Sequence, residues 1–283
     1  MKNNGISMRL IIMNFLQYAI WGAYLTSMGS YLAGIGMSAK IGIFYAMQGI
    51  VSIFMPAIVG IIADKYIPAQ KVLSICHGLA GLFMIAAGWY GMSAGENVAF
   101  GHLFGLYSLS VAFYMPTIAL SNSVAYSGLE RYGLDTVKDF PPIRVFGTVG
   151  FICSMLFVNF MTIDGVQFQH SYNQFFTSGI IGLALCAFAL TLPPCPVSKT
   201  NEGTSFVDVF GLRAFSLFKK KDMAIFFIFS MLLGVSLQIT NGFANPFITS
   251  FASIPEYADS WGAQNANALI SISQISETMC ILL

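Results

Sequence analysis

Residues 10–32, LIIMNFLQYAIWGAYLTSMGSYL, form an unbroken run without a single charged side chain. A helix needs about 20 predominantly apolar residues to cross the hydrocarbon core of a membrane. The run is therefore long enough to span a bilayer, and it is too long for the short apolar region of a secretory signal peptide. We interpret it as the core of the first membrane-spanning helix.

Further stretches of similar length and composition follow, so the sequence predicts eight spanning helices. They are expected at residues 8–33, 41–63, 71–94, 98–122, 142–163, 171–193, 223–250 and 263–283. The runs are long and lack a two-residue alternation, which argues against transmembrane strands. Only 9% of all residues are charged, whereas a soluble domain carries about 25%. The composition predicts an all-α membrane protein.

The distribution of positive charge predicts the orientation of these helices. If the N-terminus is cytoplasmic, only Lys40 of the 13 Lys and Arg residues lies outside, which leaves twelve inside. Cytoplasmic loops of membrane proteins carry an excess of Lys and Arg. We therefore expect a cytoplasmic N-terminus.

The polar segment 194–222 divides the apolar runs into two groups. It ends in the basic cluster Lys219–Lys221 and is expected to be a cytoplasmic linker. The sequence thus predicts an N-terminal six-helix bundle over residues 1–193 and the first two helices of a second bundle over residues 223–283. The chain stops at Leu283 inside an apolar run, without interfacial anchors, so we expect the second bundle to be incomplete.

A short motif lies at the expected loop between the second and third spans. Gly60 is followed four residues later by Asp64 and then by Lys65. This pattern resembles the signature loop of the major facilitator superfamily, where acidic and basic groups hold one helix bundle against the other. The motif suggests a bundle-gating loop, and the simpler alternative is an ordinary charged cytoplasmic turn.

The fifth span carries three residues suited to a polar ligand. Arg144, Thr148 and Phe151 are spaced i, i+4, i+7, so they share one face of a helix. A charge, a hydroxyl and an aromatic ring on one face suit a ligand better than lipid. Alternatively, Arg144 only extends its side chain to the cytoplasmic interface and has no ligand role.

Two polar pairs occur in the seventh and eighth spans, each spaced i, i+3: Gln238 with Asn241, and Gln274 with Glu277. Amides and carboxylates within a membrane need partners or water. Glu277 is the only acidic residue well inside an expected span, which makes it a candidate for proton exchange. The alternatives are amides that join helices and a fixed ion pair.

The first span adds a weaker signal. Gln17, Trp21 and Tyr24 are spaced i, i+4, i+7, and Trp21 could stack on a planar ligand. An aromatic stripe at this spacing is more often packing.

The sequence contains no motif for metal binding, catalysis or nucleotide binding. His77, His102 and His170 lie apart, without metal-ligand spacing, and Ser, Cys and His show no catalytic arrangement. A phosphate-binding loop of the GxxxxGK type is also missing. We therefore expect no metal, no cofactor, no nucleic acid and no enzymatic activity. An intramembrane enzyme would need a nucleophile with its base, or a metal cluster.

Four segments resemble the nucleoside:proton symporter family, the bacterial nucleoside permeases of the major facilitator superfamily. They are FMPAIVGIIADKYIPAQKVLSICH (54–77), DFPPIRVFGTVGF (139–151), MAIFFIFSMLLGVSLQITN (223–241) and ISISQISET (270–278). The similarity extends through nearly the whole chain. It implies a protein of the inner membrane with twelve helices in two six-helix bundles and a central nucleoside site that opens alternately to each side.

The resemblance also implies which residues contact the nucleoside. These positions are Arg144, Thr148, Phe151, Gln238, Asn241, Gln274 and Glu277. The implied partners are a nucleoside, a proton and the lipid bilayer, and we expect a monomer. The open alternatives are transport of another small polar solute, such as a sugar or a drug, and a receptor that only senses nucleosides.

Overall fold

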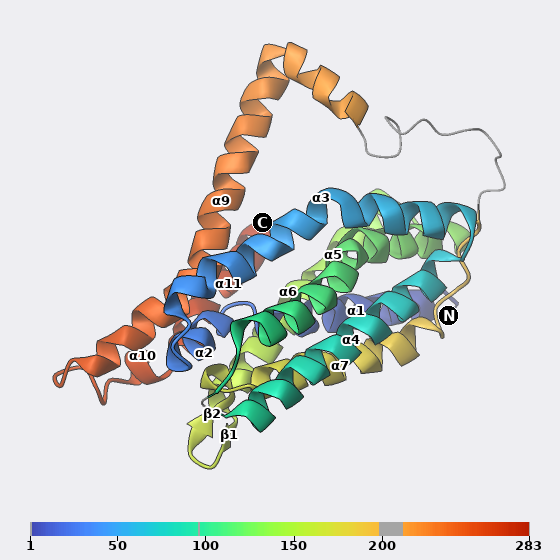
Figure 1. Cartoon of the computed structure of the whole chain (residues 1–283). Coiled ribbons are helices and arrows are strands. Elements are labelled where there is room, and N and C mark those ends of the chain that lie inside the picture. The colour runs from blue at the N-terminus through green and yellow to red at the C-terminus, as the bar shows by residue number, and fades with distance from the viewer. Residues whose placement is uncertain (1, 96, 198–211, 283) are drawn as a thin grey trace.

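The computed structural model describes residues 2–95, 97–197 and 212–282, and most of them are helical (Figure 1). The first part contains α1 (Lys2–Gly22), α2 (Met28–Gly34), η1 (Ser38–Lys40), α3 (Ile41–Lys65), α4 (Ala69–Ala94), α5 (Phe100–Arg131) and α6 (Thr136–Phe160). A short hairpin of β1 (Thr162–Ile163) and β2 (Val166–Gln167), then η2 (Phe168–His170) and α7 (Asn173–Ala189), complete this part. The second part contains η3 (Leu212–Lys219), α9 (Lys221–Ser250), η4 (Phe251–Ser253), α10 (Trp261–Gln264) and α11 (Ala266–Leu282).

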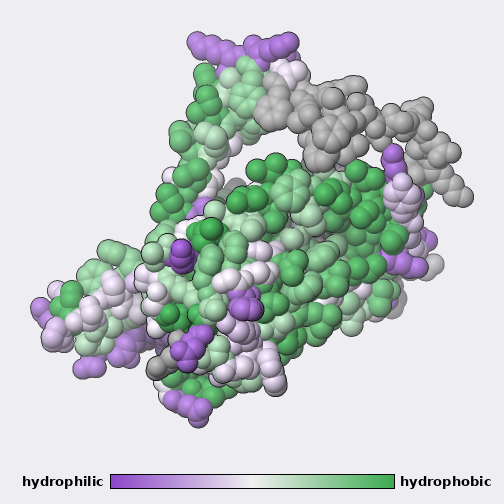
Figure 2. All heavy atoms as spheres, in the orientation of Figure 1, coloured by the Kyte–Doolittle hydropathy of each residue, from purple (hydrophilic) through white to green (hydrophobic). Residues whose placement is uncertain are grey.

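Several of these helices are long and apolar enough to cross a membrane. Within the described residues there are five, built on α3, α4, α5, α6 and α9, and α7 is a shorter apolar helix. Figure 2 shows hydrophobic side chains over the outer surface of the helices and hydrophilic atoms near their ends. The predicted class, a helical membrane protein with several spans, is confirmed.

The first span is not the single helix that we predicted. Helix α1 ends at Gly22, residues 23–27 form a turn, and α2 begins at Met28. The hydroxyls of this segment bond to other helices: Thr26 Oγ1 donates to Asn267 Oδ1 at 2.8 Å and Ser27 Oγ to Gln174 Oε1 at 3.0 Å. Irregular backbone at membrane depth is tolerated where protein surrounds it, and the turn is buried.

Several other predicted boundaries differ from the observed helices, and the largest difference is at the end of α5, which continues to Arg131 where the sequence predicted an end near residue 122. Helix α6 begins at Thr136, six residues before the predicted start, because Asp135 caps it by accepting from the backbone N–H of Val137 at 2.8 Å. Its prolines, Pro141 and Pro142, therefore lie inside the helix. The eighth span is divided at Asn265 into α10 and α11.

The helices of the first part pack closely around α1, α4 and α5. Helix α4 lies against α5 and α7, α1 lies against α6 and α7, and α3 lies against α5. Helix α9 contacts α2, α11 and the neighbouring η3 and α10, and α11 also packs on α6. Among the described residues of α9, only Gly242 and Asn245 are buried, so most of its apolar side chains are exposed. In the view of Figure 1 the N-terminal part of α9 rises away from α3.

Residues 198–211 of the predicted linker 194–222 lie outside the described part of the chain. The division into an N-terminal bundle, a linker and a partial second bundle therefore remains a prediction.

Candidate functional site

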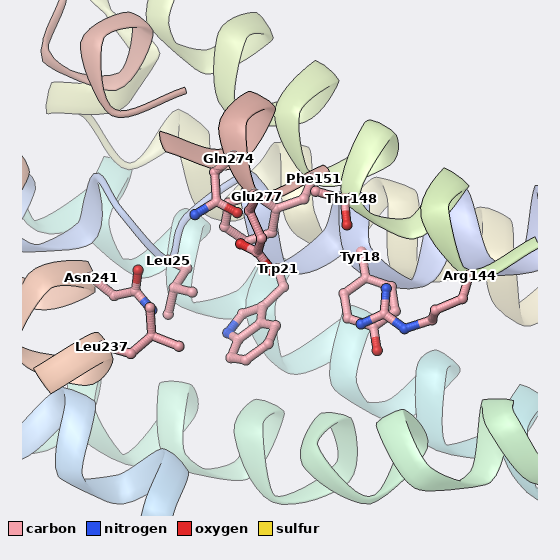
Figure 3. Close-up of a pocket in the computed structure, with 10 residues that line it drawn as sticks. All are labelled: Tyr18, Trp21, Leu25, Arg144, Thr148, Phe151, Leu237, Asn241, Gln274 and Glu277. Atoms are coloured by element: carbon pink, nitrogen blue, oxygen red, sulfur yellow. The ribbon is translucent and has the colours of Figure 1, made fainter. Parts of the chain in front are cut away.

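A cavity of about 220 Å³ lies where α9 and α11 face α1 and α6 (Figure 3). Helix α1 and the turn after it contribute Tyr18, Trp21 and Leu25, and α6 contributes Arg144, Thr148 and Phe151. The opposite side comes from Leu237 and Asn241 of α9 and from Gln274 and Glu277 of α11. The cavity thus brings together residues from distant parts of the sequence.

The structure brings six of the seven predicted contact residues to this one cavity. The exception is Gln238, whose side-chain N–H donates to the carbonyl of Tyr45 on α3 at 3.3 Å. Positions three apart on a helix differ by about 60° in direction. That difference is sufficient for Asn241 to line the cavity while Gln238 bonds to α3.

The guanidinium of Arg144 is held by an aromatic ring. Its Cζ lies 3.9 Å from the centroid of the buried Tyr18 ring, which is the geometry of a cation–π contact. Gly147 makes this approach possible, because a Cβ there would lie 2.6 Å from Tyr18 Cδ2 and 2.9 Å from an Arg144 nitrogen. Arg144 is therefore held at the cavity by its contact with Tyr18.

Trp21 forms the aromatic wall of the cavity and is fixed on two sides. Its ring meets Phe151 edge-on at 6.4 Å between centroids and lies 6.2 Å from Tyr114. Its Nε1–H donates to Gln48 Oε1 at 3.3 Å, and Gln48 Nε2 donates in turn to the Tyr107 hydroxyl at 2.8 Å. The indole is therefore held in place before any ligand arrives.

The polar side chains of the cavity have few partners. Within the described part of the chain, no hydrogen bond involves the side chains of Thr148, Asn241, Gln274 or Glu277. Thr148 is nevertheless buried and Gln274 is half-buried. Their donors and acceptors are available to a solute, and the Arg144 guanidinium and Glu277 carboxylate give the cavity one group of each charge.

A second polar region joins the same two groups of helices near the hairpin, and we call it the amide cluster. Asn245 of α9 is its centre: it accepts from Ser30 Oγ and donates to Asn267 Oδ1 at 2.7 Å and to Gln169 Oε1 at 3.2 Å. Nearby, Asn159 Nδ2 donates to Asn265 Oδ1 at 2.9 Å. The members of the cluster are Thr26, Ser30, Asn159 and Gln169 from the first part and Asn245, Asn265 and Asn267 from the second.

The predicted bundle-gating loop lies at the C-terminal end of α3. Gly60 is inside the helix, and Asp64 and Lys65 are exposed in its last turn. A Cβ on Gly60 would meet no atom within 4 Å. The gating role remains a prediction.

Three lining residues were missed from the sequence: Tyr18, Leu25 and Leu237. Tyr18, Trp21 and Leu25 are spaced i, i+3, i+7. This spacing indicates a shared helical face as clearly as the spacing of the three residues that we selected from the first span. The chosen stripe combined Trp21 with Gln17 and Tyr24, but both of these are fully buried and face α4 and α5, away from the cavity.

Comparison with known proteins gives a consistent result. A family model described as "Nucleoside H+ symporter" matches residues 4–283. Xanthosine permease from Escherichia coli (strain K12) is 44% identical over 281 residues, and nucleoside permease NupG from the same organism is 43% identical over the same length. Each alignment covers 98% of this chain and 64% of the relative.

Solved structures agree with the sequence comparison. A crystal structure of a mutant of the nucleoside transporter NupG matches with a TM-score of 0.86 and 42% identity, and a second NupG structure matches with 0.81 and 41%. Each match covers 98% of this chain and 66% of the other. The chain therefore spans slightly less than two thirds of the length of the proteins it resembles.

Proposed function

Because this chain belongs to the nucleoside H+ symporter family, we propose that it imports nucleosides together with protons. With its several long apolar helices, the chain is a multi-pass inner-membrane protein. The proposal assigns transport, rather than catalysis, to the cavity between α1 and α6 on one side and α9 and α11 on the other.

The observation that supports this proposal best is the composition of the cavity. A nucleoside is an uncharged solute with a flat base, polar base edges and ribose hydroxyls. The cavity offers aromatic rings from Trp21 and Phe151 beside the amides of Asn241 and Gln274. A site built to hydrogen-bond a solute rejects analogues that lack the matching groups, because its own polar groups are then left unpaired.

Each lining residue has a role in the proposal. The amides of Asn241 and Gln274 hydrogen-bond base and ribose edges, and the Phe151 ring packs against the base. Arg144 donates to the ligand or orders its neighbours, and Glu277 binds ribose hydroxyls or exchanges the proton. For Gln238, the proposed ligand contact requires its amide to leave the carbonyl of Tyr45.

The proposed fold is the first six-helix bundle of a major facilitator transporter, followed by two helices of the second bundle. With the N-terminus in the cytoplasm, the amide cluster lies at the outer end of the molecule. The cluster would then close the cavity on the outer side of the membrane, and the conformation described here would be open to the cytoplasm. Transport would follow when the two groups of helices rock about the cavity, as in other transporters built from repeats.

The proposal is tested by uptake of labelled uridine into energised membrane vesicles that contain the protein at its natural full length. We expect an imposed pH gradient, acidic on the side from which uridine enters, to drive uridine accumulation. A protonophore should abolish this accumulation. Uptake that ignores the gradient would remove the symport claim.

A competition panel separates the nucleoside from other cargoes. Unlabelled nucleosides should reduce uridine uptake, and free ribose or glucose in equal excess should not. Displacement by sugars alone would favour the alternative of a sugar transporter, whereas binding without counterflow in liposomes would favour a receptor.

A further inference from the structure

Behind the cavity wall, α1, α4, α5 and α7 enclose a second and much smaller space. Its volume is about 10 Å³, which is close to the minimum that one water molecule needs. Two of the residues that line it, Tyr24 and His77, each carry a buried polar atom, Oη and Nδ1, that has no hydrogen-bond partner in the described part of the chain. Buried polar groups in proteins are nearly always paired, so both atoms require an explanation.

The hydrogen bonds around Gln17 determine which nitrogen of His77 carries the proton. Thr117 Oγ1 donates to the carbonyl of Tyr114 at 2.6 Å, so towards Gln17 it can only accept. Gln17 therefore directs its Nε2 to Thr117, at 2.8 Å, and its Oε1 to His77 Nε2, at 2.7 Å.

An amide oxygen can only accept, so His77 Nε2 must be the donor. His77 is fully buried and meets only uncharged groups here, which favours the neutral ring. A neutral imidazole that is protonated on Nε2 has a lone pair on Nδ1. Two residues that line the small space therefore offer an acceptor, His77 Nδ1, and a hydroxyl donor, Tyr24 Oη.

We propose that this space holds one ordered water molecule, which accepts from the Tyr24 hydroxyl and donates to His77 Nδ1. Two further hydroxyls line the space: Ser110 Oγ donates to the carbonyl of Ala80 at 2.7 Å and Ser178 Oγ to that of Ile20 at 2.9 Å. Their oxygen lone pairs can accept the second proton of the water. Three hydrogen bonds are typical of a buried water.

The site stabilises the wall of the larger cavity. The hydroxyl of Tyr114 donates to the carbonyl of Gln17 at 2.7 Å, and the Tyr114 ring lies 6.0 Å from His77 and 6.2 Å from Trp21. The water thus completes a network whose outer member, Trp21, lines the cavity. This inference does not depend on which solute the protein carries.

The direct test uses the full-length wild-type protein. A high-resolution crystal structure should show one isolated peak within hydrogen-bonding distance of Tyr24 Oη and His77 Nδ1. Nitrogen NMR of histidine-labelled protein should show His77 as the neutral form protonated on Nε2. An empty space, or a ring protonated on Nδ1, would overturn the proposal.

A pair of isosteric variants gives an independent readout with opposite signs. If the water is present, Tyr24→Phe removes one of its hydrogen bonds and should lower the thermal midpoint by about 2–4 °C. If the space is dry, the same change removes an unpaired buried hydroxyl, and the midpoint should stay or rise. Tyr66→Phe is the control, because its side chain is exposed at the end of α3, and its midpoint should not fall.

Discussion

The same two groups of helices meet through polar residues in two different ways. At the amide cluster the side chains are buried and bonded to one another across the divide, as in the bonds from Asn245 to Asn267 and Gln169. At the cavity, the side chains of Asn241, Gln274 and Glu277 have no protein partner within the described part of the chain. Asn245 and Asn241 lie one turn apart on the same helix.

This contrast indicates how to interpret polar side chains in membrane helices. A partnered amide joins helices together, whereas an unpartnered one beside a cavity is available to a solute. The two regions should therefore respond differently to substitution. Changes in the cavity should reduce ligand binding and leave stability unchanged, and changes in the amide cluster should reduce stability.

The largest effect on ligand binding is expected at Glu277. Replacing it with Ala removes a charged hydrogen-bond acceptor, an interaction that contributes about 1.5–3 kcal/mol. Uridine binding by the full-length protein, measured by calorimetry, should weaken about 10- to 100-fold. The thermal midpoint should change little, because Glu277 is exposed and bonds to no described residue.

Ser273 provides the matched control on α11. It is exposed and its hydroxyl bonds only to the carbonyl of Ile270 in its own helix, at 2.7 Å. Ser273→Ala should bind uridine like the wild type. If Glu277→Ala binds equally well, Glu277 does not bind the ribose hydroxyls.

The next effect concerns the close contact of α2 with α9 beside the amide cluster. A Cβ at Gly29 would lie 2.5 Å from the carbonyl oxygen of Gly242 and 2.7 Å from Pro246 Cγ. Gly29→Ala should therefore force the helices apart and destabilise the protein by about 3 kcal/mol, the upper part of the usual range for overpacking. Unfolding in detergent, followed by thermal denaturation, measures the loss.

Gly34, at the other end of α2, is the control, because a Cβ there would meet no atom within 4 Å. Gly34→Ala should be neutral or slightly stabilising. Equal midpoints for the two variants would mean that α2 and α9 do not approach as closely as the structure describes.

A smaller loss of stability is expected at Asn245. Asn245→Ala removes the bonds to Asn267 and Gln169 and leaves the buried Ser30 hydroxyl without its acceptor, and such a change costs about 1–3 kcal/mol. Asn241→Ala, one turn away, should instead weaken uridine binding with little change in the midpoint. If both variants lose only binding, or both lose only stability, the division between cluster and cavity is wrong.

The sequence predicted the cavity better than the amide cluster, for a physical reason. Arg144, Thr148 and Phe151 lie on one helix, where fixed spacing determines which side chains share a face. Helical spacing also selected Gln274, Glu277 and Asn241 as cavity residues. It could not show that Asn241 lines the cavity whereas Gln238 does not. That distinction depends on the Tyr45 carbonyl of another helix.

The amide cluster escaped prediction because its members come from seven positions between Thr26 and Asn267. Gln169 follows a hairpin and Ser30 follows the break in the first span, and neither feature has a helical period. Hydropathy predicted where the chain is apolar, yet it could not show that the first span is divided at residues 23–27. The buried partners of Thr26 and Ser27 determine that break, and they are distant in sequence.

The smallest expected effect is the response of the amide cluster to pH through its neighbour His170. Burial lowers the pKa of this histidine from its ordinary value of 6.5, so the folded protein favours the neutral ring. The contribution of neutral His170 to the free energy of unfolding is fully present above the unfolded pKa of about 6.5. It decreases as the pH falls further, because the unfolded chain takes up the proton more readily. The thermal midpoint of the wild type should therefore drop more between pH 7.5 and pH 5.5 than that of His170→Gln, and identical slopes would show that His170 is solvated.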